Sequence, residues 1–286
     1  MRADPPDLAR WGLHCYCPEA LSTPHAVVAE GSNGRLLHAT RGGGASRAAL
    51  RARGLDPTEA AVARLREFDL LAVEGGLLRT TFPVLGSAET TPLRARLRSV
   101  GASLAAGIAA PVAGLCAALA DLGLADSAYA IVFGHALDGL LWDRLARAGR
   151  TPDTALCATR PWWNGVFWAV YPPRPAAAGT NFTRTDDGTL VRVWTATTAD
   201  APALRRPVIP VVGDGGELDR LAGSVADQVA EALTGPAIAA LPIDDARVAT
   251  VVVAHELIWD ITDALIDAGA ISTPEDPAAL TFLNRG

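Results

Sequence analysis

Lysine is absent from this 286-residue sequence, which also contains only four cysteines and one methionine. All 25 basic residues are therefore arginine; a GC-rich coding bias explains this, so arginine content alone does not indicate nucleic-acid binding. Four cysteines in a chain of this length predict no disulfide framework. Residues 1–7 also lack the apolar run of a signal peptide. These absences favour a reducing, intracellular setting, and we predict a cytoplasmic protein.

Charge is missing from residues 99–120, a stretch long enough to cross a bilayer. It consists mainly of Ala and Gly, with Pro111 at its centre and few Leu, Ile or Phe residues. This composition favours a helix buried in the protein or packed in a homodimer over a membrane span. The whole chain is 50% hydrophobic and 20% charged, which indicates a globular protein of one or two domains without membrane contact.

Motifs of the common catalytic and cofactor-binding classes are missing as well. Residues 213–216, Gly-Asp-Gly-Gly, lack the later glycine of a dinucleotide fingerprint and the Lys-Ser/Thr of a P-loop. Residues 222–226 do not match Gly-x-Ser-x-Gly. The segment His14-Cys15-Tyr16-Cys17 offers metal ligands, but no second Cys/His pair follows at zinc-finger spacing. We therefore expect no cofactor and no metal.

The clearest local pattern lies between residues 44 and 85. A short helix is predicted over residues 46–53, closed by Gly54. Asp56 is a suitable N-cap for a second helix over residues 57–68, with Pro57 at its first position and Glu59 completing a capping box. Two short apolar strands then flank Glu74-Gly75-Gly76, which predicts a β-hairpin.

Helix, tight turn, capped helix and hairpin together resemble the winged helix-turn-helix domain of bacterial regulators. The resemblance covers about residues 44–85. It implies that helix 57–68 enters the major groove of double-stranded DNA. The residues implied to contact DNA are Arg47, Arg51, Thr58, Ala61, Arg64 and Arg79. Thr58, Ala61 and Arg64 would face the bases, and the other three would contact phosphates.

The charge distribution fits this expectation. Between Arg35 and Arg98 there are eleven arginines and six acidic residues, a net charge of +5, which leaves −11 for the rest of the chain. A basic module attached to an acidic body is what DNA binding requires. The alternative is that these arginines only solvate helix faces.

For the whole chain we predict an α+β fold in three parts. They are a winged-helix domain over residues 1–90, a helical linker or dimerisation helix over 91–125, and a mixed helix and strand domain over 126–286. The helices expected after the hairpin are at 92–123, either continuous or bent or broken at Pro111, and at 126–148, 217–233 and 245–268. The expected strands are at 166–171, 181–184, 190–197 and 207–212. Asp187-Gly188 predicts a hairpin turn, and the prolines of 207–212 place that strand at a sheet edge.

Two histidines lie in apolar helical stretches that resemble each other. Residues 133–149 align without gaps on residues 253–269, sharing the histidines His135 and His255, an Asp eight positions later and a closing Ala-Gly. Chance in an Ala- and Leu-rich chain explains this match. Alternatively, two equivalent helices bring both histidines into one region. Such histidines are either hydrogen-bonded in a core or active in binding and acid–base chemistry.

Aromatic residues give the strongest indication of a small-molecule site. Six tryptophans stand near these helices or on neighbouring strands: Trp142, Trp162, Trp163, Trp168, Trp194 and Trp259. Clustered tryptophans either line a pocket for a flat ligand or pack in a core. In strand 166–171, Trp168 and Val170 point away from the face of Phe167 and Ala169, so both faces cannot line one cavity.

The leading hypothesis is a homodimeric winged-helix transcriptional regulator that binds double-stranded DNA and responds to a small, aromatic ligand through His135, His255 and the tryptophans. Glu59, Glu67 and the alanines of helix 57–68 offer few groups for reading bases, which supports two alternatives. One is a biosynthetic enzyme of winged-helix architecture that acts without a cofactor on a peptide or aromatic substrate. Its catalytic candidates are His135, His255, Asp138 and Glu256. The other is a non-catalytic module that holds a protein partner.

Overall fold

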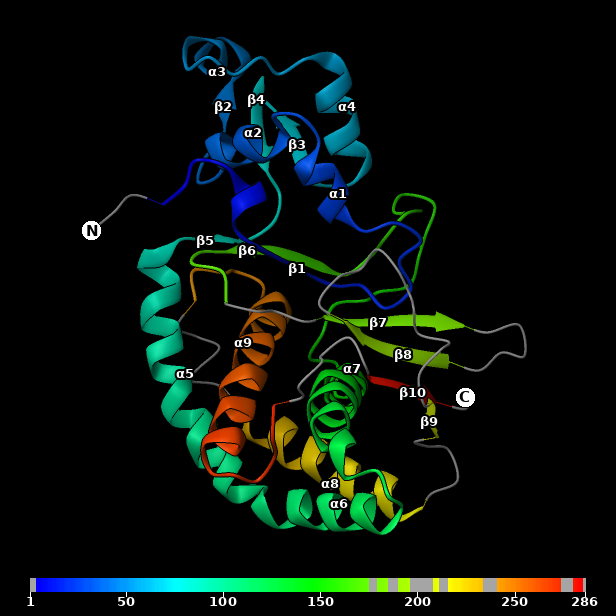
Figure 1. The fold of residues 1–286 in the computed structure, drawn as a ribbon. Coiled ribbons are helices and arrows are strands. Elements are labelled where there is room, and N and C mark those ends of the chain that lie inside the picture. Colours follow the sequence, from blue (N-terminus) through cyan, green and yellow to red (C-terminus); the bar gives the residue numbers. More distant parts are fainter. Residues whose placement is uncertain are drawn as a thin grey trace. The chain divides into compact units, whose positions relative to one another are not determined.

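The computed structural model describes residues 4–174, 179–184, 190–195, 208–210, 216–233, 241–273 and 280–284. It has a mixed α+β architecture, as predicted, and the chain divides into two compact units (Figure 1). The first unit comprises Met1–Leu93, Pro152–Arg174 and Ile243–Val251. The second comprises Arg94–Thr151, Pro175–Pro242 and Val252–Gly286. The first boundary lies near the expected residue 90, but each unit is assembled from separate segments, unlike the contiguous domains that we expected.

The first unit contains two three-stranded sheets with short helices. Its elements are η1 (Leu8–Arg10), β1 (Gly12–Tyr16), α1 (Pro24–Ala29), α2 (Asn33–Thr40), β2 (Ala45–Ser46), α3 (Arg47–Ala52), α4 (Glu59–Glu67), β3 (Leu71–Glu74), β4 (Leu77–Thr80), β5 (Val84–Leu85) and β6 (Val166–Val170). One sheet has the order β2-β4-β3, and α3 and α4 lie beside it (Figure 1). The other has the order β1-β6-β5.

The predicted hairpin is confirmed by strands β3 and β4. Gly75 and Gly76 form its two-residue turn with φ angles of 56° and 80°. Both angles are positive, as the type I′ turn that matches strand twist requires, and glycine adopts them without steric cost. The short helix before it is confirmed as α3, with the Ser46 hydroxyl accepting a hydrogen bond from the Ala49 N–H.

The second helix begins later than predicted, and Asp56 is not its N-cap. The hydroxyl of Thr58 caps α4 by accepting a hydrogen bond from the Ala61 N–H, 3.2 Å away. The Asp56 carboxylate instead lies 3.5 Å from the Arg51 Nε. The Pro57 carbonyl accepts a bond from the Arg47 guanidinium at 2.6 Å, so it is held outside the helical hydrogen-bond ladder. Contacts with α3 therefore override the local capping pattern.

Strand β6 lies at the centre of the second sheet, antiparallel to β1 and parallel to β5. Every residue of β6 is buried. Phe167 and Ala169 belong to the core of the first unit, which Leu37, Leu50 and Leu65 of the helices also form. Trp168 and Val170 face the other way, as the alternation predicted. Strand β1 was not predicted, since all its residues are half-buried and its sequence shows no clear alternation.

The second unit is mainly helical. Its elements are most of α5 (Ser87–Gly107), α6 (Ala109–Asp121), η2 (Ala125–Ser127), η3 (Ala130–Leu140), α7 (Leu141–Arg147), β7 (Gly179–Arg184), β8 (Leu190–Thr195), β9 (Val208–Pro210), α8 (Glu217–Ala232), most of α9 (Ala246–Asp267) and β10 (Leu280–Asn284). Helix α8 packs against α6, η3 and α7. Helices α8 and α9 confirm the two predicted C-terminal helices.

The expected helix over 92–123 is two helices that bend by 59° at Ile108. Pro111 explains the break, because its missing N–H cannot bond the carbonyl of Gly107. Pro111 is the third residue of α6, and the N–H groups in the first turn of a helix have no carbonyl partner within that helix, so the missing N–H of Pro111 costs α6 no hydrogen bond. Within the described residues no single helix is long and apolar enough to cross a membrane, and only this bent pair would pass if both helices were taken together.

The prediction of one continuous α-helix over 126–148 is wrong, because most of this segment is not α-helical. The segment contains a 3-10 turn, the π-helix η3 and only then the α-helix α7. Nine of the eleven residues of η3 are buried. Because nearly all positions are apolar, the sequence has no hydrophobic periodicity that could distinguish a π-helix from an α-helix. The predicted end is right, since Gly149 follows α7 with a φ of 66°.

A four-stranded sheet with the order β7-β8-β10-β9 completes the second unit. The antiparallel pairing of β7 with β8 confirms the predicted strands, although the turn at Asp187-Gly188 lies outside the described residues. Strand β9 lies at the edge, as its prolines predicted. Strand β10 was not expected and pairs with both β8 and β9. Residues 213–215 of the glycine-rich segment lie outside the described residues, and Gly216 is the N-cap of α8.

Candidate functional sites

Two of the arginines predicted to contact DNA are held within the first unit. Arg47 donates to the Pro57 carbonyl at 2.6 Å and to the Glu59 carboxylate at 3.0 Å, and so fixes the turn between α3 and α4. Arg64 lies over the Phe68 ring, with its guanidinium carbon 4.4 Å from the ring centroid, and pairs with Glu67 at 3.0 Å. Both arginines therefore have structural roles in this conformation.

The other two candidate arginines, Arg51 and Arg79, form exposed ion pairs. Arg51 lies 3.5 Å from Asp56, and Arg79 lies 3.6 Å from Glu74 at the hairpin tip. At least half of each arginine side chain is exposed. Exposed pairs of this kind contribute about 0–1 kcal/mol, so a DNA phosphate could replace the carboxylate at little cost.

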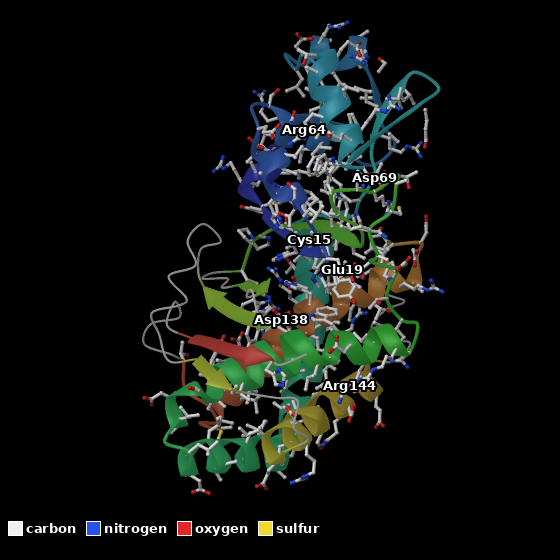
Figure 2. All side chains as sticks on the ribbon, turned by 90° about the vertical axis from the view of Figure 1, so that its right-hand side faces the viewer. Cys15, Glu19, Arg64, Asp69, Asp138 and Arg144 are labelled. Carbon is white, nitrogen blue, oxygen red and sulfur yellow. A yellow bond between two sulfur atoms is a disulfide. The ribbon has the colours of Figure 1, made fainter. Side chains whose placement is uncertain are left out.

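The outward face of α4 differs from the predicted one. Thr58 uses its hydroxyl as the cap, and Ala61 and Arg64 are half-buried. The exposed residues of this helix are Glu59, Ala60, Ala63, Arg66 and Glu67. Figure 2 shows Arg64 on α4, with Asp69 beyond the end of the helix. The exposed face therefore carries one arginine, two carboxylates and two alanines, a set with few hydrogen-bonding groups for base edges.

A third group of arginines, which the sequence did not single out, lines one pocket. Arg35 and Arg41 come from α2 and its C-terminus, and Arg53 follows α3; His38 joins them from α2. The pocket has a volume of about 450 Å³. Arg35 and His38 are one helical turn apart, which the sequence could have shown. The position of Arg53 beside these α2 residues depends on tertiary packing, so no local sequence pattern could have predicted it.

His135 of η3 is completely buried. Its Nε2 lies 3.9 Å from a carboxylate oxygen of Asp219 on α8. Asp138, one turn further along, accepts a hydrogen bond from the indole N–H of Trp142 at 3.0 Å. The structure thus places an Asp from another helix near His135, and Asp138 positions a tryptophan.

His255 lies on α9 beside a buried ion pair. Glu256 is fully buried, and its Oε2 accepts a hydrogen bond from the Arg94 Nε at 2.7 Å. The His255 Nδ1 lies 3.9 Å from the other carboxylate oxygen. Burial raises the pKa of Glu256, but the proximity of His255 and Arg94 lowers it by more, so the net pKa is well below its usual range. Glu256 is therefore a carboxylate across the neutral range and cannot serve there as a proton donor.

The two stretches that align in sequence are not equivalent helices. Residues 133–140 lie in the π-helix η3, whereas residues 253–267 lie in the α-helix α9. Because the two windings differ in residues per turn, equal spacing in sequence does not give equal directions around the axis. This difference favours chance as the origin of the match. Phe133 and Trp259 are in contact, with ring centroids 4.6 Å apart.

The tryptophans belong to both units. Trp163 and Trp168 are buried in the first unit, and Trp163 donates to the Phe68 carbonyl. Trp162 is 38% exposed and donates to the Glu67 carboxylate. Trp142 and Trp259 are half-buried in the second unit. The side chain of Trp194 lies outside the described residues. Core packing thus accounts for Trp163, whereas Trp168 is buried on the other face of β6 beside His14.

Two of the four cysteines form a disulfide between positions close in sequence, and the other two are free thiols. Cys15 and Cys17 are joined, which closes a ring across Tyr16 alone and connects no distant parts of the chain. In this state neither sulfur is a thiolate that could bind a metal beside His14. Cys116 is half-buried, and burial raises the pKa of its thiol. Hydrogen bonds from the Thr159 hydroxyl and from nearby backbone N–H groups lower the pKa of the exposed Cys157.

These pKa shifts predict selective alkylation. At pH 7 we expect iodoacetamide to modify Cys157 about tenfold faster than Cys116, because the thiolate is the nucleophile and Cys157 is exposed. Mass spectrometry of peptides after timed quenching measures both rates. Thr159→Ala removes the hydroxyl that lies 3.3 Å from the sulfur and should slow the reaction at Cys157 only. Equal rates at both cysteines would contradict this assignment.

Three features can therefore carry function: the helices and hairpin around the β2-β4-β3 sheet, the arginine-lined pocket, and the buried polar groups of the second unit. Each must be interpreted from its own chemistry. No family model, no curated protein and no solved structure matches this chain.

Proposed function

We propose that this protein is a DNA-binding regulator whose DNA-binding module is a winged helix-turn-helix built from α2, β2, α3, α4, β3 and β4. The observation that carries the proposal is the order of these elements together with the sheet order β2-β4-β3. Helices α3 and α4 then correspond to the helix-turn-helix and the β3-β4 hairpin to the wing. The step from this architecture to DNA binding is an analogy between folds, supported by the net charge of +5 between Arg35 and Arg98.

The structure changes which residues we assign to DNA contact. Arg51 and Arg79 would bind phosphates by exchanging their exposed carboxylate partners. Arg66 adds a cation on the outward face of α4. Arg47 and Arg64 would support the turn and the helix rather than touch DNA. Because α4 exposes few base-reading groups, this protein would recognise its site mainly through phosphate positions and DNA shape.

The regulator would respond to a ligand through its second unit. A small aromatic ligand would find half-buried indole rings there, those of Trp142 and Trp259. Homodimerisation and a cytoplasmic location remain predictions of the sequence and belong to this proposal. We no longer assign Trp163 and Trp168 to the ligand site, because both are buried: Trp163 packs in the core of the first unit, and Trp168 is buried on the opposite face of β6.

A paired substitution tests DNA binding. The variant Arg51→Ala/Arg79→Ala should weaken binding to fragments of the source genome and lower the slope of log K against log salt by about 2, one unit for each phosphate contact. Fluorescence anisotropy at several salt concentrations measures both quantities. Arg147→Ala/Arg220→Ala is the matched control, since it removes two exposed arginines from α7 and α8 and leaves the winged-helix candidate intact. Equal loss in the two variants would contradict the assignment.

The exposed side chains of α4 and the hairpin favour a second candidate, a module that holds a protein partner. Val73 is 46% exposed and Leu77 is 38% exposed on the hairpin, and Ala60 and Ala63 are exposed on α4. Exposed apolar groups of this kind suit a protein surface better than a DNA groove. If the wild-type protein binds no DNA fragment even at low salt, the regulator proposal fails and this candidate replaces it. A partner-holding module would also serve the enzyme alternative.

A further inference from the structure

The arginine-lined pocket has an excess of positive charge that nearby carboxylates do not neutralise. In the described part of the chain, Arg35, Arg41 and Arg53 have no carboxylate within ion-pair distance, in contrast to Arg47, Arg51, Arg64 and Arg79 of the same unit. The Nε2 of His38 is buried and has no hydrogen-bond partner among the described residues. Three exposed arginines without carboxylate partners and the half-buried His38 thus line one open pocket.

The charges of two acids, Asp4 and Asp7, act on His38, but both carboxylates accept hydrogen bonds from other groups. Asp7 accepts a hydrogen bond from the Ala9 N–H as the N-cap of η1. Asp4 accepts hydrogen bonds from the backbone N–H and the hydroxyl of Ser87. Both carboxylates act on His38 only through space, and their effect is smaller than that of burial and of Arg41. Burial, and next the charge of Arg41, lower the pKa of His38 to about 4, although Asp4 and Asp7 act to raise it. His38 is therefore neutral at pH 7.

Trp11 holds one wall of the pocket in place. Its indole N–H donates to the Pro5 carbonyl at 2.9 Å, and the ring is 95% buried. Its ring centroid lies 5.7 Å from that of His38, and the Arg41 guanidinium carbon lies 5.8 Å from the same ring. Arg41 also donates to the His38 carbonyl at 3.3 Å. These contacts limit the rotamers of His38 and Arg41. Binding a ligand would therefore cost less side-chain conformational entropy, because folding has already ordered both side chains.

We propose that this pocket binds a small organic anion that carries a phosphate group. Guanidinium groups bind phosphate oxygens through paired hydrogen bonds, and three of them can neutralise a dianion. The pocket volume of about 450 Å³ exceeds that of a bare ion and lies in the range of small-molecule sites. Pro6, Ala39 and Leu55 supply apolar surface for the organic part of the ligand. None of its lining residues is among those assigned to DNA contact, although α2 also belongs to the proposed winged-helix module, and the anion proposal does not rest on DNA binding.

Titration calorimetry with pyrophosphate as the probe tests the proposal on the full chain. We expect saturable one-site binding, and Arg35→Ala and Arg53→Ala should each weaken it by about tenfold, the effect of losing one charged hydrogen bond. Within the part of the chain that the structure describes, neither the Arg35 nor the Arg53 side chain donates a hydrogen bond, so thermal unfolding should remain close to that of the wild type. Arg147→Ala changes the net charge by the same amount in the second unit and should bind as the wild type does. Binding that is absent, or that all three variants weaken equally, would overturn the proposal.

A second readout separates the pocket from general charge effects. A bound anion should raise the pKa of His38 from about 4 towards its usual value of 6.5, which NMR of the imidazole ring measures with and without pyrophosphate. His38→Gln identifies the resonance. An unchanged His38 titration at saturating pyrophosphate would overturn the assignment. If duplex DNA shifts this titration and pyrophosphate does not, the pocket contacts a DNA backbone phosphate and the small-anion proposal is wrong.

Discussion

Arg94→Met is expected to lower the free energy of unfolding by about 3–5 kcal/mol, because it leaves the fully buried Glu256 carboxylate without its guanidinium partner. Chemical denaturation at pH 7 measures this change. Arg96→Met is the matched control, since it makes the same substitution at an exposed position two residues away and should stay within about 0.5 kcal/mol. If the two variants were equally stable, Arg94 would not be the partner that compensates the buried charge.

The same ion pair predicts how stability depends on pH. The pKa of Glu256 is lowered in the folded protein, so its contribution to stability is fully present above the usual value of 4.5 and is lost as the pH falls below it. Glu256→Gln removes this titration and should flatten the loss of stability below pH 4.5. In Arg94→Met/Glu256→Gln both partners are neutral, so the double variant should be more stable than Arg94→Met alone.

This behaviour bears on the enzyme alternative. A general acid or base works best with a pKa near the working pH, and the pKa of Glu256 lies far below it. His135 is completely buried and could meet a substrate only after the second unit opened. We therefore infer that Glu256 stabilises the fold. An assay of His135→Ala and His255→Ala for lost turnover remains the direct test of catalysis.

Local sequence signals predicted the elements that local chemistry determines. Gly75-Gly76 specified a turn because only positive φ angles close a two-residue hairpin, and Pro111 specified the break between α5 and α6 because it lacks an N–H. The prolines of β9 correctly placed that strand at an edge. In each case one residue type has a backbone property that no tertiary contact replaces.

Tertiary contacts decided the features that the sequence did not reveal. Thr58 rather than Asp56 caps α4, because Arg47 and Arg51 from α3 bind Pro57 and Asp56. The contacts of Arg47 and Arg64 were hidden in the same way: residue type does not show which guanidinium binds a backbone carbonyl and which lies over an aromatic ring. Strand β1 exists because β6, more than 150 residues later, pairs with it. Such pairing leaves no periodic trace in a short strand whose residues are all half-buried.

Gly165→Ala is expected to lower the free energy of unfolding by about 3–5 kcal/mol. Gly165 has a φ of 141°, a conformation that side chains rarely adopt, and a Cβ atom there would overlap with the carbonyl oxygen of Tyr16. Tyr16 is the last residue of β1 and pairs with Val166 of β6. The substitution therefore strains the backbone and also pushes apart the two strands that bring residues 152–174 into the first unit.

Gly43→Ala separates these two causes. Gly43 has almost the same φ, 137°, but no atom lies within 4 Å of the position that its Cβ would take. Backbone strain alone should then cost about 1–2 kcal/mol. The difference between the two variants in chemical denaturation measures the close approach of β1 and β6 at Tyr16. If both variants lost equal stability, the contact between position 165 and the Tyr16 carbonyl would contribute nothing. The backbone conformation alone would then explain why residue 165 is a glycine. A larger loss for Gly165→Ala would show that the first unit depends on a chain segment far from the winged-helix candidate, so that residues 1–93 alone would not fold to the same unit.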